Sequence, residues 1–509
     1  MRVAAWIACV LLLCGMAAGC RQNPSSLSSD TTPSGTVSAA DPTDTLSLGF
    51  NPEDTLNPYA AKTQLNLYLS HLLYDTLVKV DAGFMPTLSL AKTADLTDST
   101  HLTVSLKSGA VFSDGSGITP QDVVYSFEKA KDSANYRAFV SNFQSAAVKK
   151  GTVVFTLSSP DPYAAACLIF PIMKRGTDTD KPAAAPLGSG PYVYHADTLS
   201  LTVNPKAEVQ KARFTTVALK AMVSQAEVLQ AFESGNIHYF YDDLSDGSIP
   251  RTTASQTTVD QNQLVYLGMN TGKPLLSSPE FRRAIALALD RTAIASSAYT
   301  GRARPAVTPF HPLWQPAAGL TALPASPDSD TAETLLKTAL DQPVTTPTDD
   351  ATAPTVATAG TVPTLTLLYP AGNSCREAAA KLITRQLALI GIPVTANAVS
   401  YNDYLTRLSA GDYDLYLGEI RLSPNMNLQV FFTAGGAASY GVPTGGNTAL
   451  QYAALRRGET ALPDFVRAFS EEMPYIPLVF KQGMAAYHRS ISYITPSSYN
   501  VFDGILKWQ

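Results

Sequence analysis

Residues 365–420 read LTLLYPAGNSCREAAAKLITRQLALIGIPVTANAVSYNDYLTRLSAGDYDLYLGEI, and this stretch decides the fold class. Apolar runs of strand length alternate here with segments whose apolar residues recur at helical spacing. The pattern predicts strands at 365–369, 394–399 and 413–420 and helices at 376–389 and 402–409. Strands separated by helices of this length pair in parallel through right-handed crossovers, so the sequence predicts an α/β fold.

The carboxyl end of the last predicted strand is the first candidate for a ligand site, because ligands of open parallel sheets bind beyond the strand ends. Gly418, Glu419 and Arg421 lie there. Glu419 and Arg421 are two residues apart, so their side chains project from one face of the strand. A carboxylate and a guanidinium at this place could hold a zwitterion, the carboxylate taking an amine and the guanidinium an acid. Alternatively, the two pair with each other or latch two parts of the protein together.

Two earlier helices have clear start signals. Thr119 precedes Pro120 and Asp122, a capping box that predicts a helix from Pro120 to about residue 132. Ser278 before a proline starts a second apolar stripe that should end near residues 290–291. Both helices fit a mixed α/β chain.

The N-terminus has the features of an export signal. Residues 1–19 contain Arg2, then a short apolar run and small residues. The sequence AAGC at 17–20 resembles the bacterial lipobox, in which the cysteine, here Cys20, carries lipid and becomes the first residue of the mature protein. Residues 20–44 are poor in apolar residues, which predicts a flexible tether. The alternative is an ordinary signal peptide that ends near a cysteine.

Composition and motifs argue against several functional classes. The net charge is -5 and no run of Lys or Arg occurs, which argues against a nucleic-acid partner. The six histidines fall singly, and the chain has no HExxH, GxSxG or phosphate-binding loop, so we predict no catalytic residue, metal site or cofactor. Cys167 and Cys375 are the two cysteines of the folded part, too few for a disulfide framework.

Six short blocks between residues 72 and 415 resemble, in order, family 5 of the bacterial solute-binding proteins, which includes oligopeptide, dipeptide and nickel binders. The combination is specific, although no single block is. The blocks are LLYDTL at 72–77, LKSG at 106–109 with FSDG at 112–115, Thr119 with DVVYSFE at 122–128, LGSGPY at 187–192, RRAI at 282–285 with ALDR at 288–291, and Gly391-Ile392 before DYDL at 412–415.

The resemblance implies a type II periplasmic-binding-protein fold, in which two lobes joined by a hinge close over the ligand and an extra domain is inserted. It also implies where the parts of the chain belong. The expected parts are lobe I at 45–77, 187–265 and 474–509, the extra domain at 78–186, and lobe II at 266–473, with a low-complexity insertion at 345–362.

The resemblance implies further ligand contacts. Phe480 and Lys481 fall near the family's aromatic cleft positions, and Tyr59 and Tyr440 are similar candidates. Aromatic side chains with a polar tip suit peptides. Phe480 could instead be a core residue, and Tyr440 could belong to a disordered loop at 435–446.

One departure from the family concerns the ligand's amine. Peptide-binding relatives carry a tryptophan after the glycine that matches Gly418 and, three positions later, an aspartate that holds the peptide amine. Read without gaps, these places are Glu419 and Leu422 here, so the aspartate is absent. Either Glu419 substitutes for it or the ligand has no amine.

The resemblance therefore implies a function without catalysis. We expect a monomeric substrate-binding lipoprotein of an ABC importer, held outside the cytoplasmic membrane by the lipid on Cys20. It would capture a peptide or peptide-like small solute between its lobes and deliver it to the permease. The alternatives are a surface lipoprotein hydrolase that acts on cell-wall peptides, and a pheromone or solute sensor on the same fold.

Overall fold

Residues 365–421 form one side of a seven-stranded mixed sheet in the computed structural model, which describes residues 43–207, 212–341 and 362–509. Strand β14 (Leu365–Pro370) pairs in parallel with β15 (Val394–Val399) and with β16 (Leu415–Arg421), which confirms the predicted parallel pairing. The strand order is β11 (Tyr239–Asp242), β17 (Ile476–Tyr487), β12 (Ser255–Met269), β16 (Leu415–Arg421), β14 (Leu365–Pro370) and β15 (Val394–Val399), and β13 (Ala303–Pro305) pairs with β17.

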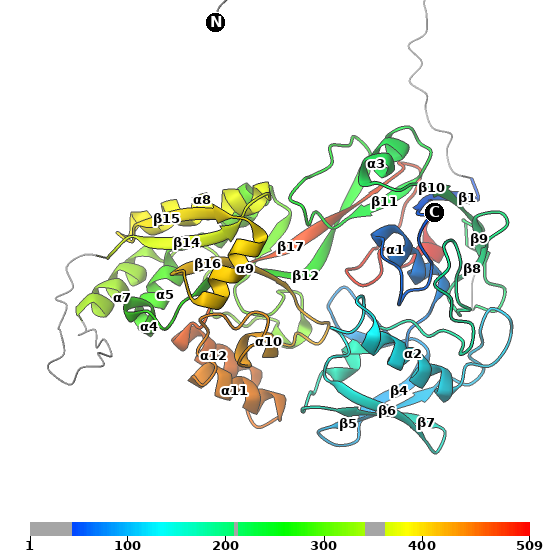
Figure 1. The fold of residues 1–509 in the computed structure, drawn as a ribbon, viewed down its shortest axis with the longest axis horizontal. Coiled ribbons are helices and arrows are strands. Elements are labelled where there is room, and N and C mark those ends of the chain that lie inside the picture. Colours follow the sequence, from blue (N-terminus) through cyan, green and yellow to red (C-terminus); the bar gives the residue numbers. More distant parts are fainter. Residues whose placement is uncertain (1–42, 208–211, 342–361) are drawn as a thin grey trace, which may run out of the picture. The chain divides into compact units, whose positions relative to one another are not determined.

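Three smaller sheets come from the N-terminal half of the described chain (Figure 1). Strand β1 pairs in parallel with β10, although the two are far apart in sequence. The sheets are β1 (Thr45–Phe50), β10 (Thr216–Ala221), β9 (Ser200–Val203) and β8 (Tyr192–His195); β4 (Ala91–Leu96), β5 (His101–Leu106), β7 (Thr152–Leu157) and β6 (Phe143–Lys149); and β2 (Val78–Val80) with β3 (Pro86–Leu88).

The helices begin where the sequence places caps. In α2 the Thr119 hydroxyl accepts from the Asp122 N–H, and the Asp122 carboxylate accepts from the Thr119 N–H at 2.9 Å, so the predicted capping box is confirmed. The α-helices are α1 (Gln64–Leu73), α2 (Pro120–Asp132), α3 (Gln225–Glu233), α4 (Pro274–Ser277), α5 (Pro279–Ala288), α6 (Arg291–Ala293), α7 (Ser329–Asp341), α8 (Ser374–Leu389), α9 (Tyr401–Ala410), α10 (Gln429–Phe432), α11 (Asn447–Arg456) and α12 (Leu462–Glu472). Single turns occur at Ala164–Cys167, Ile294–Ala298, Gln315–Ala317 and Ile505–Lys507.

Helix α5 ends close to its predicted end. The apolar stripe predicted an end near residues 290–291, and α5 ends at Ala288, after which Leu289 is extended. Asp290 then accepts from the Ala293 N–H and caps the next helix, α6. A capping aspartate competes with continuation of the helix, since its side chain satisfies the amides of a new first turn.

Buried side chains form two large clusters. The first core contains buried residues between Leu46 and Val259 and between Ala485 and Trp508. The second core contains buried residues between Leu264 and Phe480, together with Val80 and Phe84. Strands β12 and β17 run side by side through both cores (Figure 1).

The boundary between the cores on these two strands is polar. It consists of residues 260–263 of β12 and 481–483 of β17, with the sequences DQNQ and KQG, which we call the polar junction. The ladder is irregular here: Asp260 pairs with Gln482 and Leu264 with Phe480, so β12 has two more residues than β17 in this interval. Such a bulge interrupts the ladder and bends the strand locally.

Several features predicted from the sequence stay predictions. The export signal and Cys20 lie outside the described residues, as do residues 345–361 of the insertion. The lobe and extra-domain boundaries also stay predictions. Within the described ranges, none of the helices combines the length and apolarity that crossing a bilayer requires.

Candidate functional site

Glu419 lies at the centre of a buried charge cluster beside the polar junction. Its Oε1 accepts from Gln263 Nε2 and from Lys481 Nζ, both at 2.9 Å, and its Oε2 accepts from Arg376 Nη2 at 3.1 Å. Burial by itself would raise the pKa of Glu419, but the charges of Lys481 and Arg376 and the hydrogen bonds to this carboxylate hold that pKa below its ordinary value. Glu419 is therefore an ionised carboxylate whose two oxygens already have three donors.

Three separate elements bring this cluster together. Glu419 belongs to β16 and Lys481 to β17, while Arg376 lies in the first turn of α8, just after β14. The exposed fractions of these side chains are 14%, 5% and 18%. The structure thus unites two predicted site residues, Glu419 and Lys481, and adds Arg376, which the sequence analysis missed. The carboxyl-end rule applied to β14 would have pointed to it.

A second ion pair lies at the same junction. Arg304 donates to the Asp260 carboxylate from Nε at 2.5 Å and from Nη2 at 3.0 Å, and Gln482 Nε2 donates to Asp260 Oδ1 at 2.7 Å. Burial favours a raised pKa for Asp260, yet these donors lower the pKa overall. Bidentate pairs of this kind fix geometry as well as charge, so the junction is held in register.

Arg421 points into a different environment from Glu419. Its side chain is exposed, its Nη2 donates to the Ser498 carbonyl at 3.2 Å, and it takes part in no ion pair of the described chain. Its guanidinium carbon lies 5.9 Å from the Phe139 ring centroid and 5.8 Å from that of Tyr499. An exposed guanidinium beside aromatic rings keeps donors for a carboxylate and gains cation–π attraction.

Tyrosines of both cores lie within the electrostatic reach of Arg421. Burial raises the pKa of Tyr136 to about 12 and the positive charge of Arg421 opposes that rise. The same pattern holds for Tyr499, where burial raises the pKa to about 12 and Arg421 lowers it. The Tyr136 ring is 6.3 Å from Phe139 and 5.4 Å from Tyr59. Arg421 therefore lies between Phe139, which packs against the first core, and Tyr499, which packs against the second.

The other predicted site residues are buried or half-buried. Tyr59 is buried, and its hydroxyl donates to the Pro171 carbonyl. Phe480 is fully buried in the second core with its ring 4.7 Å from His311. Tyr440 is half-buried, and its carbonyl accepts from the Tyr416 hydroxyl at 3.3 Å. Ligand contact by these residues stays a prediction.

Gly418 supports the strand pairing next to this site. A Cβ built on Gly418 would lie 2.3 Å from Cζ of Tyr266, on the neighbouring strand. We expect Gly418→Ala to lower the free energy of unfolding by about 1–3 kcal/mol, the usual cost of overpacking. Urea unfolding would measure it, with Gly445→Ala as control, because a Cβ there meets no heavy atom within 4 Å. Equal stability of the two variants would contradict the close approach.

His311 gives the protein an acid sensitivity. The ring is fully buried, its Nδ1 accepts from the Leu313 N–H at 3.1 Å, and burial lowers its pKa to about 3. The unfolded chain binds a proton below about pH 6.5 whereas the folded chain does not, so stability falls as pH drops from 6.5 towards 3. We expect a loss of about 2 kcal/mol between pH 7 and pH 5 from this residue.

Urea unfolding of the wild type and of His311→Asn at pH 7, 6 and 5 would measure that loss. Asn keeps a side-chain acceptor but does not titrate. The variant should lose about 2 kcal/mol less than the wild type over this range, whatever its stability at pH 7. Parallel pH profiles would show that His311 is not responsible.

Asp161 connects the two cores away from the polar junction. Its side chain is fully buried, and the residues that flank it in the sequence, Leu157 and Ala164, belong to the first core. Asn425 Nδ2 donates to Asp161 Oδ2 at 2.5 Å, and Arg456 Nη2 lies 2.9 Å from the same oxygen. Arg456 of the second-core side is therefore the counter-ion of this carboxylate, whose other oxygen accepts from the Tyr163 N–H at 3.0 Å.

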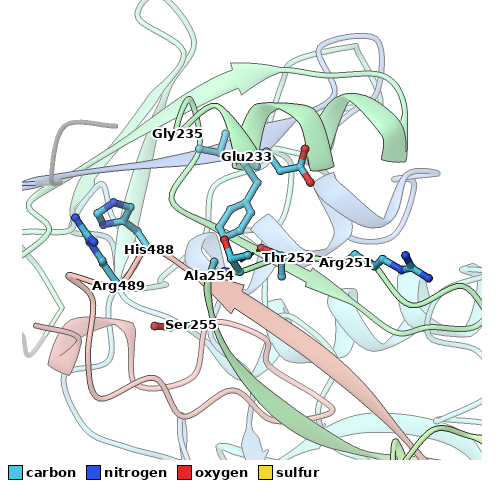
Figure 2. A pocket seen from close by; sticks show the side chains of 11 residues that line it. Glu233, Gly235, Arg251, Thr252, Ala254, Ser255, His488 and Arg489 are labelled. Atoms are coloured by element: carbon cyan, nitrogen blue, oxygen red, sulfur yellow. Dashed lines mark hydrogen bonds between the residues drawn. The ribbon is translucent and has the colours of Figure 1, made fainter. Parts of the chain in front are cut away.

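A pocket of about 590 Å³ lies elsewhere, at the end of α3 and the start of β12. None of the predicted site residues lines it. Figure 2 shows Arg251 and Arg489 on opposite sides of the hollow, so its charged groups do not converge. Binding sites for small solutes need a few polar groups that converge, and we do not assign the solute site here.

Comparison with known proteins agrees with the fold. The model of the bacterial extracellular solute-binding proteins, family 5 Middle, matches residues 86–439. The oligopeptide-binding protein AppA of Bacillus subtilis is 25% identical over 371 residues, 68% of this chain and 67% of its own. A Brucella ovis protein, named as a candidate ABC transporter peptide-binding protein, is 26% identical over 52% of this chain. The chain spans 54% of that relative's length.

Solved structures show the same architecture. The murein tripeptide binding protein MppA in its unliganded open form has a TM-score of 0.69 at 17% identity, covering 92% of this chain and 98% of its own. A nickel ABC transporter protein of Bacillus halodurans also has a TM-score of 0.69, at 18% identity, covering 90% and 97%. The α/β fold predicted from the sequence is confirmed. The chain belongs to family 5 of the bacterial extracellular solute-binding proteins, a family of non-catalytic binding proteins.

Proposed function

We propose that this chain captures a peptide-like solute for an ABC importer and delivers it to the permease. The observation that carries the proposal is the exposed guanidinium of Arg421 on β16, which faces the Phe139 ring of the first-core side and the Tyr499 ring of the second-core side. A carboxylate would take the free donors of Arg421 while the rings cover the apolar part of the solute. Relatives named for oligopeptide and murein tripeptide binding support a peptide.

Capture follows from the two-core construction. A solute that touches Arg421 on one side and the Phe139 ring on the other binds best when both sides are close, so it shifts the population towards the closed form. Lipid on Cys20 and the tether would keep the monomeric protein outside the cytoplasmic membrane, near its permease. In this role the protein returns its solute chemically unchanged.

A thermal-shift screen tests the proposal with free peptides of two to five residues, Ni²⁺ with free histidine, and haem. A true ligand at 100 times its Kd stabilises the folded state by about 2.7 kcal/mol, which raises the unfolding midpoint measurably. Peptides should raise the unfolding midpoint of the protein, and mass spectrometry should recover one intact peptide per protein molecule. Stabilisation by nickel–histidine or haem alone would exclude a peptide solute, and cleaved peptide would support the hydrolase.

A further inference from the structure

Asp243 is a half-buried carboxylate that follows β11 on the first-core side. Its Oδ1 accepts from the Ser245 N–H at 2.9 Å, and it takes part in no ion pair that the structure describes. The neighbouring Asp242 differs, because Gln225 Nε2 and the Leu244 N–H donate to its two oxygens, each at 2.8 Å. Asp243 thus keeps one carboxylate oxygen for a further donor.

A pair of tyrosines lies beside Asp243. The rings of Tyr68 on α1 and Tyr241 on β11 meet edge to face with centroids 5.3 Å apart. Gln261 Nε2 donates to the Tyr241 hydroxyl at 2.8 Å and to the Asp243 carbonyl at 3.0 Å, so it ties the tyrosine to the acid's backbone. Gln261 belongs to the polar junction. For the Tyr68 hydroxyl, the described residues supply no hydrogen-bond partner.

Asp243 and Arg421 act on this tyrosine pair with opposite sign. Burial raises the pKa of both Tyr68 and Tyr241. In both residues the negative charge of Asp243 raises the pKa further and the positive charge of Arg421 lowers it. The strand register agrees, because Arg421 pairs with Gln263 across β16 and β12, and Gln261, two residues earlier on β12, contacts both Tyr241 and Asp243. Neither Asp243 nor Arg421 has a protein counter-ion among the described residues.

We propose that Asp243, the Tyr68–Tyr241 pair and Arg421 form a site for a zwitterionic peptide, in which Asp243 accepts from the terminal amine and Arg421 donates to the terminal carboxylate. This inference rests on the proposed function. Glu419 already accepts from Lys481, Arg376 and Gln263, so the amine goes to Asp243. The peptide supplies the counter-ion that each charge lacks, and its backbone lies against the tyrosine rings.

Chemical editing of the peptide termini tests this assignment. Native mass spectrometry with an equimolar mixture of free peptides of two to five residues selects the tightest binder as the probe. Calorimetry then compares the probe, its N-acetyl form and its C-terminal amide on wild type, Asp243→Asn and Arg421→Gln. Each hydrogen bond between charged groups contributes enough for about a tenfold change in Kd.

The expected pattern is a crossed one. Asp243→Asn should raise the Kd of the free probe about tenfold or more and that of the N-acetyl form less than about threefold. Arg421→Gln should likewise raise the Kd of the free probe about tenfold or more and that of the C-terminal amide less than about threefold. Asp246→Asn, which removes an exposed charge from the same loop, should change no Kd more than about threefold. If Asp243→Asn lowers the affinity for the free probe and for its N-acetyl form equally, Asp243 does not hold the amine and the assignment is overturned. Absence of any bound peptide would overturn the proposed function as well.

Discussion

Replacing Arg421 with Ala is expected to weaken binding of a carboxylate-bearing peptide by more than about tenfold, because the solute loses a charge-assisted hydrogen bond and its cation partner. The exposed position of Arg421 predicts that the unfolding midpoint of the ligand-free protein changes little. Isothermal titration calorimetry on wild type and variant measures the effect.

Arg421→Lys is the matched control that separates the effect of the positive charge of residue 421 from that of its planar guanidinium. Lysine keeps the positive charge but lacks the planar fork, so its Kd should lie between those of wild type and Arg421→Ala. An unchanged affinity in both variants would mean that Arg421 serves only to hold the Ser498 carbonyl. In that case the candidate site would lose its carboxylate partner.

Replacing Asp161 with Ala is expected to lower the free energy of unfolding by about 3–5 kcal/mol. The change leaves the Arg456 guanidinium, which is 10% exposed, without its anion and leaves Asn425 without its acceptor. A buried unpaired charge costs far more than the pair contributes, which is why removal of one partner is so damaging. Urea unfolding measures the loss.

The double variant Asp161→Ala with Arg456→Met separates charge from packing. Because it removes both charges, it should recover most of the stability that the single variant loses. If the double variant is as unstable as the single one, the loss comes from the cavity and not from the unpaired arginine. If Asp161→Ala is as stable as the wild type, the pair does not connect the cores in solution.

Local sequence patterns predicted the elements of this fold well. The alternation of 365–420 gave the parallel strands, and Thr119 with Asp122 gave the start of α2. Both signals are local, since strand period and capping chemistry depend on residues a few positions apart. The end of α5 was predicted to within two residues, and Asp290, just beyond it, acts as the cap of the next helix.

The site was predictable only in part. Strand-end position pointed to Glu419 and Arg421, and the same rule applied to β14 points to Arg376, but no local pattern shows which residues of distant segments pair. Arg376 reaches Glu419 across 43 residues and Asn425 reaches Asp161 across 264. Asp243 gave no signal in the sequence, because acidic residues often follow short strands. Only the structure shows that Asp243 has no counter-ion among the described residues.

Strands β12 and β17 stay hydrogen-bonded on both sides of the polar junction, which has a mechanical consequence. A rotation of one core relative to the other cannot be absorbed by slack loops at these two crossings; it must twist a two-stranded ribbon. Between Asp260 and Leu264 that ribbon lacks regular ladder bonds, and side-chain bonds to Asp260 hold it instead. If the proposed capture rotates one core relative to the other, the stiffness of this short interval would oppose closure and favour release of the solute.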